Sequence, residues 1–192
     1  MMNRKLSLRA ALLATIVAFG AASFAAPSIA EMTVMVGGAP MYPSKNIVEN
    51  AVNSKDHTTL VAAVKAAGLV DTLEGAGPFT VFAPTNEAFA KLPKGTVETL
   101  LKPENHDKLV AVLTYHVVPG RMTAQDLADK VDQGGGQAML KTVQGEDLIF
   151  KREGRSHLTV TDAKGDTAVI TIPNVLQSNG VIHVINTVLI PG

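Results

Sequence analysis

The sequence predicts an α+β domain in which several short helices come first and a set of antiparallel strands follows. Three observations support this fold class. Residues 44–133 hold apolar side chains at helical spacing between capping and breaking residues. Residues 139–172 alternate apolar and polar side chains between glycine-containing turns. Residues 181–190 form an almost uninterrupted apolar run, which we expect to lie in the core.

Residues 1–30 have the layout of a secretory signal peptide. Three basic residues precede an apolar stretch at 10–22, and small residues stand before a cleavage position between Ala30 and Glu31. The stretch is shorter than the roughly 20 apolar residues of a transmembrane helix. We therefore expect a cleaved signal and a secreted or periplasmic mature chain; an uncleaved membrane anchor is the alternative.

The segment 31–44 is predicted to be an irregular lead-in, because two glycines and two prolines interrupt it. The domain itself is expected over 45–192. Ser44 is the expected N-cap of a first helix and Asp56 that of a second, which should end at Gly68.

A short buried strand is predicted at 79–83, where aromatic and β-branched residues follow a Gly-Pro turn. Thr85 should cap the next helix, and a further helix is expected from 105 to 117. Thr123 and Asp126 are spaced like a capping box, which predicts another short helix. The later strands should be joined by hairpins and have one solvated face; they are expected at 139–143, 148–151, 157–161 and 168–172.

The composition excludes several classes of function. The chain has no cysteine, which excludes disulfides, cysteine-ligated metals and a thiol nucleophile. Three of the 17 basic residues lie in the signal, so the remainder carries 14 basic against 17 acidic residues. There is no basic stripe and no tryptophan, so nucleic-acid binding is not expected. No later segment is apolar enough to cross a bilayer.

The sequence lacks the motifs of the common catalytic sites. The serines after the signal stand in no Gly-x-Ser-x-Gly motif, and no metalloprotease, phosphate-loop or dinucleotide motif is present. We expect no enzyme activity and no cofactor.

Three segments resemble a known family. FTVFAPTNEAF at 79–89, LTYHVVPG at 113–120 and NGVIHVIN at 179–186 resemble the signature segments of fasciclin domains, in the family's order. The resemblance covers about 45–191. It implies a wedge-shaped β-sandwich of antiparallel strands packed with several short α-helices, in a secreted or surface protein that mediates adhesion.

Two departures limit that resemblance. Animal matrix members carry an Asp-Ile pair that is implicated in integrin binding, where this chain has Asn174 and Val175. Integrin recognition therefore cannot be carried over. Asn186 stands where many relatives have aspartate.

The predicted contact region consists of residues Tyr115–Arg121 and the loop Pro173–Asn179. The first lies at a helix end and the second precedes the core strand, so both can present side chains at an edge. The predicted interaction residues are Tyr115, His116, Pro119, Arg121, Asn174, Val175 and Gln177. For His116 the alternative is a structural role on the inner face of its helix, with a hydrogen-bonded ring. His183 is expected to face opposite to its strand neighbours and to tie the strand to a loop.

The leading hypothesis is an exported binding or cell-adhesion module that contacts a protein, polysaccharide or lipid at a cell surface or in the envelope, and acts as a monomer. The alternative is a periplasmic protein that binds copper or another small ligand through its Met-rich lead-in. Thioether and imidazole groups suit Cu(I), and the candidate ligands are Met32, Met35, Met41 and His57.

Overall fold

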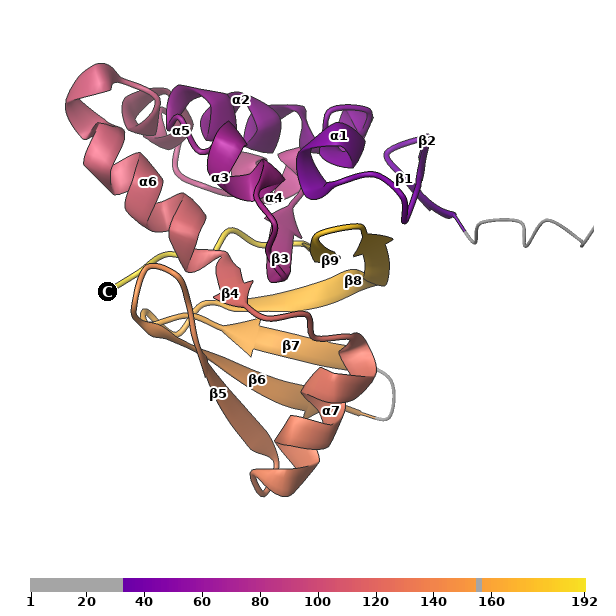
Figure 1. Cartoon of the computed structure of the whole chain (residues 1–192). Coiled ribbons are helices and arrows are strands. Elements are labelled where there is room, and N and C mark those ends of the chain that lie inside the picture. The colour runs from indigo at the N-terminus through magenta and orange to yellow at the C-terminus, as the bar shows by residue number, and fades with distance from the viewer. Residues whose placement is uncertain (1–32, 155–156) are drawn as a thin grey trace, which may run out of the picture. The chain divides into compact units, whose positions relative to one another are not determined.

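A computed structural model describes residues 33–154 and 157–192, which fold as the predicted α+β domain (Figure 1). The predicted signal peptide and Met32 lie outside the described residues.

Seven strands form one sheet in the order β4-β3-β9-β8-β7-β6-β5. The neighbours are antiparallel except β3 and β9, which run parallel in register from Phe79 opposite Gly180 to Pro84 opposite Ile185. The predicted hairpin strands are thus confirmed, but the parallel pair was not predicted. The strands are β3 (Phe79–Pro84), β4 (Val117–Pro119), β5 (Gln137–Lys141), β6 (Asp147–Glu153), β7 (His157–Thr161), β8 (Thr167–Gln177) and β9 (Gly180–Ile185).

Short helices precede and interrupt the sheet. Several of them start at a side chain that accepts one of the N–H groups left without a partner at a helix start. Thr85 caps α4 as predicted, and Thr123 and Asp126 form the predicted capping box of α7. Asp56, the expected cap of the second helix, lies inside the 3-10 turn before α2 and caps no helix. The helices are α1 (Ile47–Ala51), α2 (Thr58–Ala66), α3 (Val70–Glu74), α4 (Asn86–Ala90), α5 (Thr96–Leu100), α6 (His106–Tyr115) and α7 (Ala124–Gln133), with 3-10 turns at Lys55–His57 and Pro103–Asn105.

Two further predictions of helix boundaries are wrong. The first helix is capped by Asn46, whose side chain accepts from the Glu49 N–H, and not by Ser44. The helix predicted to reach residue 117 ends at Tyr115, because Val117 begins the edge strand β4 beside β3.

The segment predicted as an irregular lead-in is a β-hairpin over its described part. Strands β1 (Val34–Val36) and β2 (Ala39–Met41) are antiparallel and turn at two glycines with positive φ. A side chain at Gly37 would meet the backbone nitrogens of Lys55 and Asp56 at 2.7 Å, so only glycine fits there. Val36 and Met41 are buried in the domain core, so the hairpin belongs to the domain.

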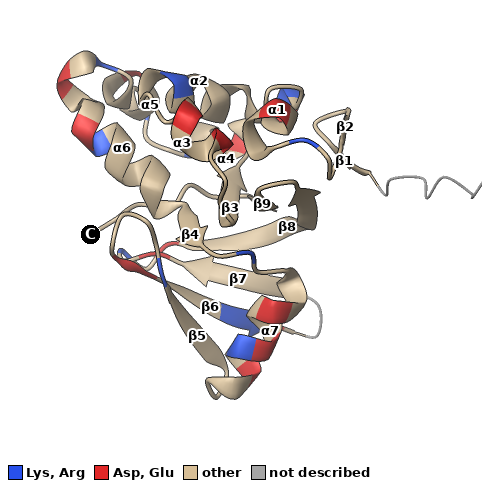
Figure 2. Ribbon diagram, in the orientation of Figure 1, with Lys and Arg blue, Asp and Glu red and all other residues tan. Residues whose placement is uncertain are grey.

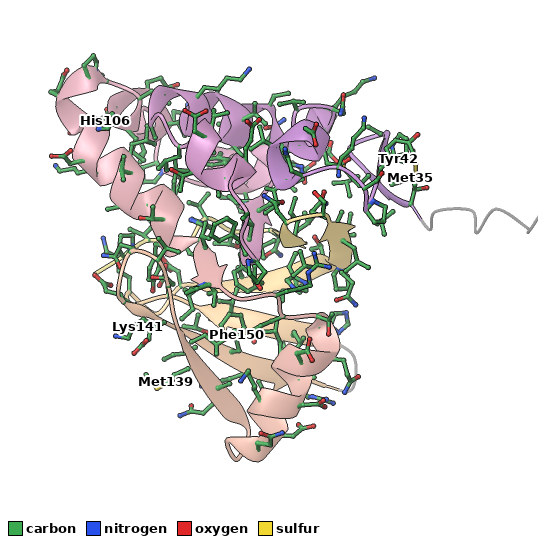
Figure 3. The ribbon with its side chains drawn as sticks, viewed as in Figure 1. Met35, Tyr42, His106, Met139, Lys141 and Phe150 are labelled. Atoms are coloured by element: carbon green, nitrogen blue, oxygen red, sulfur yellow. The ribbon has the colours of Figure 1, made fainter. Side chains whose placement is uncertain are left out.

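Two apolar clusters fill the interior, and β3 and β9 lie between them. Val81 and Ala83 face the first cluster, under helices α1–α6, whereas Phe82 faces the second. The second cluster lies between α7 and strands β5–β8 and includes Phe150 (Figures 1 and 3). Strands buried on both faces need apolar residues at successive positions, which explains the unbroken apolar run of β9.

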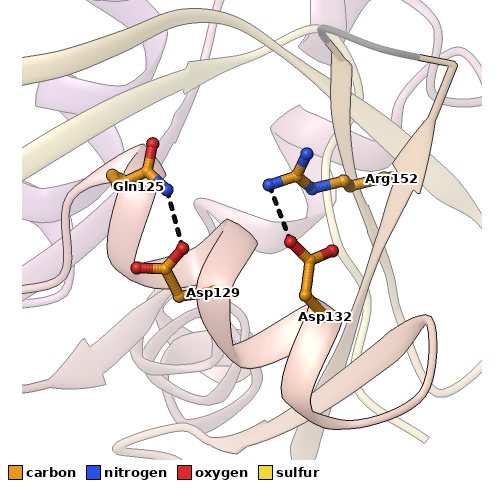
Figure 4. A network of polar contacts seen from close by, with 4 residues as sticks. All are labelled: Gln125, Asp129, Asp132 and Arg152. Atoms are coloured by element: carbon orange, nitrogen blue, oxygen red, sulfur yellow. Dashed lines mark hydrogen bonds and ion pairs between the residues drawn. The ribbon is translucent and has the colours of Figure 1, made fainter.

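The described surface carries mixed charges. Acidic residues of α7 lie beside basic residues of the same helix and of β6 (Figure 2). One ion pair joins Arg152 to Asp132 at 3.1 Å, and Gln125 donates to Asp129 at 2.6 Å along α7 (Figure 4). No helix within residues 33–154 and 157–192 is long and apolar enough to cross a membrane.

Candidate functional site

The predicted interaction residues divide into an exposed and a buried set. Pro119, Arg121 and Asn174 are exposed. The other four are no more than 3% exposed, so the expectation that their side chains are presented at an edge is wrong; they are Tyr115, His116, Val175 and Gln177.

Tyr115 is fully buried at the end of α6. Its hydroxyl donates to the Asp147 carbonyl at 3.1 Å and accepts from the Ala163 N–H at 3.0 Å. Burial raises the pKa of this hydroxyl. The side chain therefore fixes α6 against the turns that flank the hairpin strands.

His116 links α6 to the end of the chain. Its Nδ1 donates to the Val112 carbonyl at 2.8 Å, and its Nε2 accepts from the Leu189 N–H at 3.0 Å. Both bonds need the neutral ring, and burial lowers the pKa of His116 to about 4. These contacts support a structural role for His116 on the inner face of its helix.

The structure brings the two predicted contact segments together, but the second is not a loop, because residues 173–177 belong to strand β8. Arg121 donates from Nη2 to the carbonyls of Gln177 at 2.6 Å and Ser178 at 3.1 Å. The Asn174 Oδ1 accepts from the Ala124 N–H at 2.7 Å. We call the exposed area formed by residues 119–123 and 173–178 the paired-segment surface.

Two buried residues of the central strands hold the paired-segment surface from below. Thr80 Oγ1 donates to the Gly120 carbonyl at 2.6 Å and accepts from the Met122 N–H at 2.9 Å. His183 donates from Nε2 to the Met122 carbonyl at 2.9 Å, and its Nδ1 accepts from the Asn174 N–H at 3.3 Å. A single histidine thus bridges both segments, and burial lowers its pKa. The predicted facing of His183 is confirmed, because its ring stacks on Phe82 in the second cluster.

Asn174 has a backbone conformation that few residues adopt. Its φ is +60°, in the left-handed region that asparagine tolerates better than most non-glycine residues. The same side chain satisfies an N–H in the first turn of α7, which lacks a partner inside the helix. Asparagine therefore serves two structural needs at this position.

Gln177 belongs to a buried amide network and not to the surface. Asn50 donates to the Gln177 Oε1 and to the Tyr42 carbonyl, and Gln177 donates to the Val175 carbonyl at 3.2 Å. Nearby, Asn179 accepts from the Ile47 N–H and donates to two carbonyls at the end of α3. These amides fix the backbone whose carbonyls Arg121 contacts. Sequence patterns alone do not distinguish such buried amides from exposed loop residues.

The chemistry offered by the paired-segment surface is one cation beside small polar and apolar groups. Over the described ranges, the hydrogen bonds of Arg121 to the protein all come from Nη2, which leaves Nε and Nη1 for a partner. Leu176 is 38% exposed on the same segment. The arrangement suits a carboxylate or carbonyl of a partner next to an apolar contact.

Of the candidate copper ligands that the structure describes, Met41 and His57 line the same pocket, whereas Met35 lies on the other face of its hairpin. In the β1–β2 hairpin Met41 pairs with Val34, whereas Met35 pairs with Pro40, so the two thioethers lie on opposite faces. Met35 is exposed (Figure 3), and Met41 and His57 are buried. Among the residues that the structure describes, no three His, Cys, Asp or Glu side chains gather in one place.

Comparison with known proteins gives the family. The family model of the fasciclin domain matches residues 55–191. The chain belongs to the fasciclin domain family. Protein sll1483 of Synechocystis is 49% identical over 162 residues, which covers 84% of this chain and 82% of that protein.

More distant relatives contain the same unit within longer chains. The transforming growth factor-beta-induced protein ig-h3 of Sus scrofa is 35% identical over 78% of this chain, but over 20% of its own length. A solved pair of fasciclin domains from the insect cell adhesion molecule Fasciclin I has a TM-score of 0.68 at 19% identity. That structure covers 77% of this chain and is matched over 51% of its own, and it shows that the two share a fold.

Proposed function

We propose that this chain is an exported fasciclin-type adhesion module that binds a cell-surface or envelope partner through the paired-segment surface. The observation that carries the proposal is the joining of two predicted contact segments by Arg121, with Asn174 and His183 holding them in place. A surface fixed by buried hydrogen bonds loses little conformational freedom when it binds.

The likeness to a solved fasciclin structure supports adhesion, and the first 30 residues of the sequence support export. The solved structure with this fold is described as part of a cell adhesion molecule. The first 30 residues have the layout of a secretory signal, which would place the mature chain in the periplasm or outside the cell.

The test compares two arginines. Arg121→Gln removes the charge of the paired-segment surface and keeps an amide donor for the facing carbonyls. Arg152→Gln removes the same charge from β6, where Arg152 pairs with Asp132 (Figure 4). Beads coated with each variant are offered to intact cells and to immobilised polysaccharide, phospholipid vesicles and envelope proteins.

We expect Arg121→Gln to lower attachment about tenfold, the effect of losing a contact of about 1.4 kcal/mol, while Arg152→Gln attaches like the parent. Thermal unfolding of each variant confirms that the fold is intact. Equal attachment by both variants would show that the surface is wrong, and no attachment by the parent to any target would refute the binding role.

A further inference from the structure

The two edges of the seven-stranded sheet differ in how they are protected. An edge strand carries unpaired N–H and C=O groups that can pair with another chain, and proteins limit this with proline, charge, bulges or covering elements. At one edge, β4 ends at Pro119, and its Val117 carbonyl accepts from the Val143 N–H at 2.8 Å. At the other edge, β5 holds no proline and pairs with β6 without a bulge. The edge at β5 is therefore the one that can accept another strand.

The free backbone groups of β5 belong to alternate residues. In an antiparallel ladder, hydrogen-bonded pairs alternate with pairs whose N–H and C=O groups point away from the partner strand. Just beyond β5, Thr142 and Glu146 form a hydrogen-bonded pair, in which the Thr142 N–H donates to the Glu146 carbonyl at 2.9 Å. Counting back from this pair, the backbone groups of Gln137, Met139 and Lys141 point away from β6. Among the hydrogen bonds of the described residues, none reaches these groups.

The side chains of β5 leave the centre of this edge apolar. Met139 is 59% exposed and projects away from the domain (Figure 3). Ala138 and Leu140 pack against the second cluster from the other face of the strand and are partly exposed. The charged residue of β5, Lys141, stands at its end, where its Nζ donates to the Gly145 carbonyl at 3.2 Å. The middle of β5 thus carries no charge that would oppose pairing.

The sequence of β5 is complementary to itself when two copies run antiparallel. A pairing centred on Met139 places this residue opposite its own copy and Gln137 opposite Lys141 of the second copy. Each of these pairs joins residues whose backbone groups are free, so the two strands can exchange about six N–H···O bonds. On the other face, Ala138 lies opposite Leu140 of the second copy. Apolar side chains therefore meet on both faces, and like charges do not meet across the strands.

We propose that two copies of this chain pair antiparallel along β5, with Met139 of one copy opposite Met139 of the other, so that the two sheets become continuous. The contact is isologous, as in most homodimers. A five-residue strand buries less than a standard interface of about 1,600 Å², so the dimer is reversible, with a dissociation constant on the order of 100 µM. The sequence predicted a monomer, and this edge supports self-association at high local concentration. Other residues form the paired-segment surface, so the proposal does not depend on the adhesion role.

The first experiment places charges at the position that pairs with itself. Met139→Lys and Met139→Glu each bring two like charges face to face across the twofold axis, which destabilises a strand pair. In sedimentation velocity between about 10 µM and about 1 mM, we expect the parent to dimerise and each variant to associate with itself at least about tenfold more weakly. An equimolar mixture of the two variants should regain dimerisation, because opposite charges then face each other.

The matched control is Met35→Lys, because Met35 is 57% exposed on the β1–β2 hairpin. This variant should dimerise like the parent, and thermal unfolding checks that every variant folds. A parent that stays monomeric at about 1 mM would overturn the proposal, whatever other strand the edge accepts. Equal dimerisation by the parent and both Met139 variants, or no gain from mixing the two, would also overturn it.

Hydrogen exchange followed by NMR tests the register on the parent protein. The N–H groups of Met139 and Lys141 should exchange about fivefold more slowly at about 1 mM than in dilute solution, because most of the protein is then dimeric. The Leu140 N–H bonds to β6 and should be protected equally at both concentrations. Exchange at Met139 that does not depend on concentration would overturn the proposal.

Discussion

Helices α1–α6 cover the first apolar cluster and form the helix-rich region, whereas α7 and strands β5–β8 enclose the second and form the hairpin region. The two regions bury their apolar side chains in different ways. The first is built from short pieces, since α1, α3, α4 and α5 have five residues each, and it contains an apolar pocket of about 90 Å³. The second combines long strands with the ten-residue α7, whose Leu127 and Val131 are almost fully buried. Phe82 and Phe150 pack with ring centroids 5.1 Å apart in the hairpin region.

The difference follows from the number of element ends. Every helix end leaves backbone groups without partners inside the helix, so a region of short helices needs buried polar side chains, of which Asn50 and Asn179 are examples. Regular hairpins satisfy their own backbone and leave the interior to apolar contacts. The paired-segment surface rests on β3 and β9, between the two regions.

The largest expected effect comes from truncating one phenylalanine in each region. Phe82 is fully buried between Phe150 and His183, whereas Phe89 is 8% exposed at the end of α4. Phe-to-Ala changes cost about 3–5 kcal/mol, depending on how well the site collapses. We expect the loss in the free energy of unfolding, measured with urea, to lie near the upper end of this range for Phe82→Ala. For Phe89→Ala it should lie near the lower end. An equal or larger loss for Phe89→Ala would contradict the difference in packing.

The next effect is a loss of stability in acid. The pKa of His116 is about 4 in the folded protein, against an ordinary value of 6.5, because burial disfavours the charged ring. The unfolded chain therefore binds the extra proton first. The stability is complete above pH 6.5 and falls as the pH drops toward 4, by about 3 kcal/mol in total. His57 and His183 act in the same direction, because burial lowers their pKa as well.

The measurement is the free energy of unfolding from about pH 7 to about pH 5, above the range where most carboxylates titrate. His116→Gln should flatten the dependence relative to the parent, although the variant starts from a lower stability. His106→Gln, which changes an exposed histidine of α6, is the control and should keep the parent's dependence. The histidine explanation fails if the parent is equally stable across this range.

The sequence predicted what depends on local pattern. The capping box at Thr123 and the cap at Thr85 were correct because the partners lie three residues away. The hairpin strands were correct because alternation survives when one face is solvated. The glycine end of α2 was also correct: Gly68 has positive φ, and Leu69 donates back to Val64.

What the sequence did not predict depends on distant contacts. The parallel pairing of β3 with β9 joins segments that are about a hundred residues apart. Gln177 lies just before a predicted turn, and its buried partner Asn50 is 127 residues away in the sequence. The β1–β2 hairpin looked irregular because its turn glycines and Pro40 outweighed two three-residue strands. The two contact segments lie side by side in the structure, but the sequence pattern did not distinguish their exposed side chains from their buried ones.

The smallest expected effect tests the link between the central strands and α7. Asn174→Ala removes the acceptor for the Ala124 N–H and places alanine at a φ of +60°. Losing a cap costs about 0.5–2 kcal/mol, and asparagine already bears part of the cost of the left-handed backbone. We therefore expect a loss of about 1–2 kcal/mol in the free energy of unfolding. Asn174→Gly removes the strain of the left-handed backbone, so it should lower the free energy of unfolding by less than Asn174→Ala does.

Asn174→Asp completes this series, because it keeps the acceptor and adds a negative charge at the start of α7, where the helix dipole favours it. It should be as stable as the parent or slightly more stable. Hydrogen exchange locates the change: Asn174→Ala should lower protection in α7 and leave α1–α3 unaffected, since the lost bond leads only to α7. Loss of protection in the helix-rich region would mean that the two regions unfold together. Stability of the aspartate variant would also show that the fold does not require the amide found here.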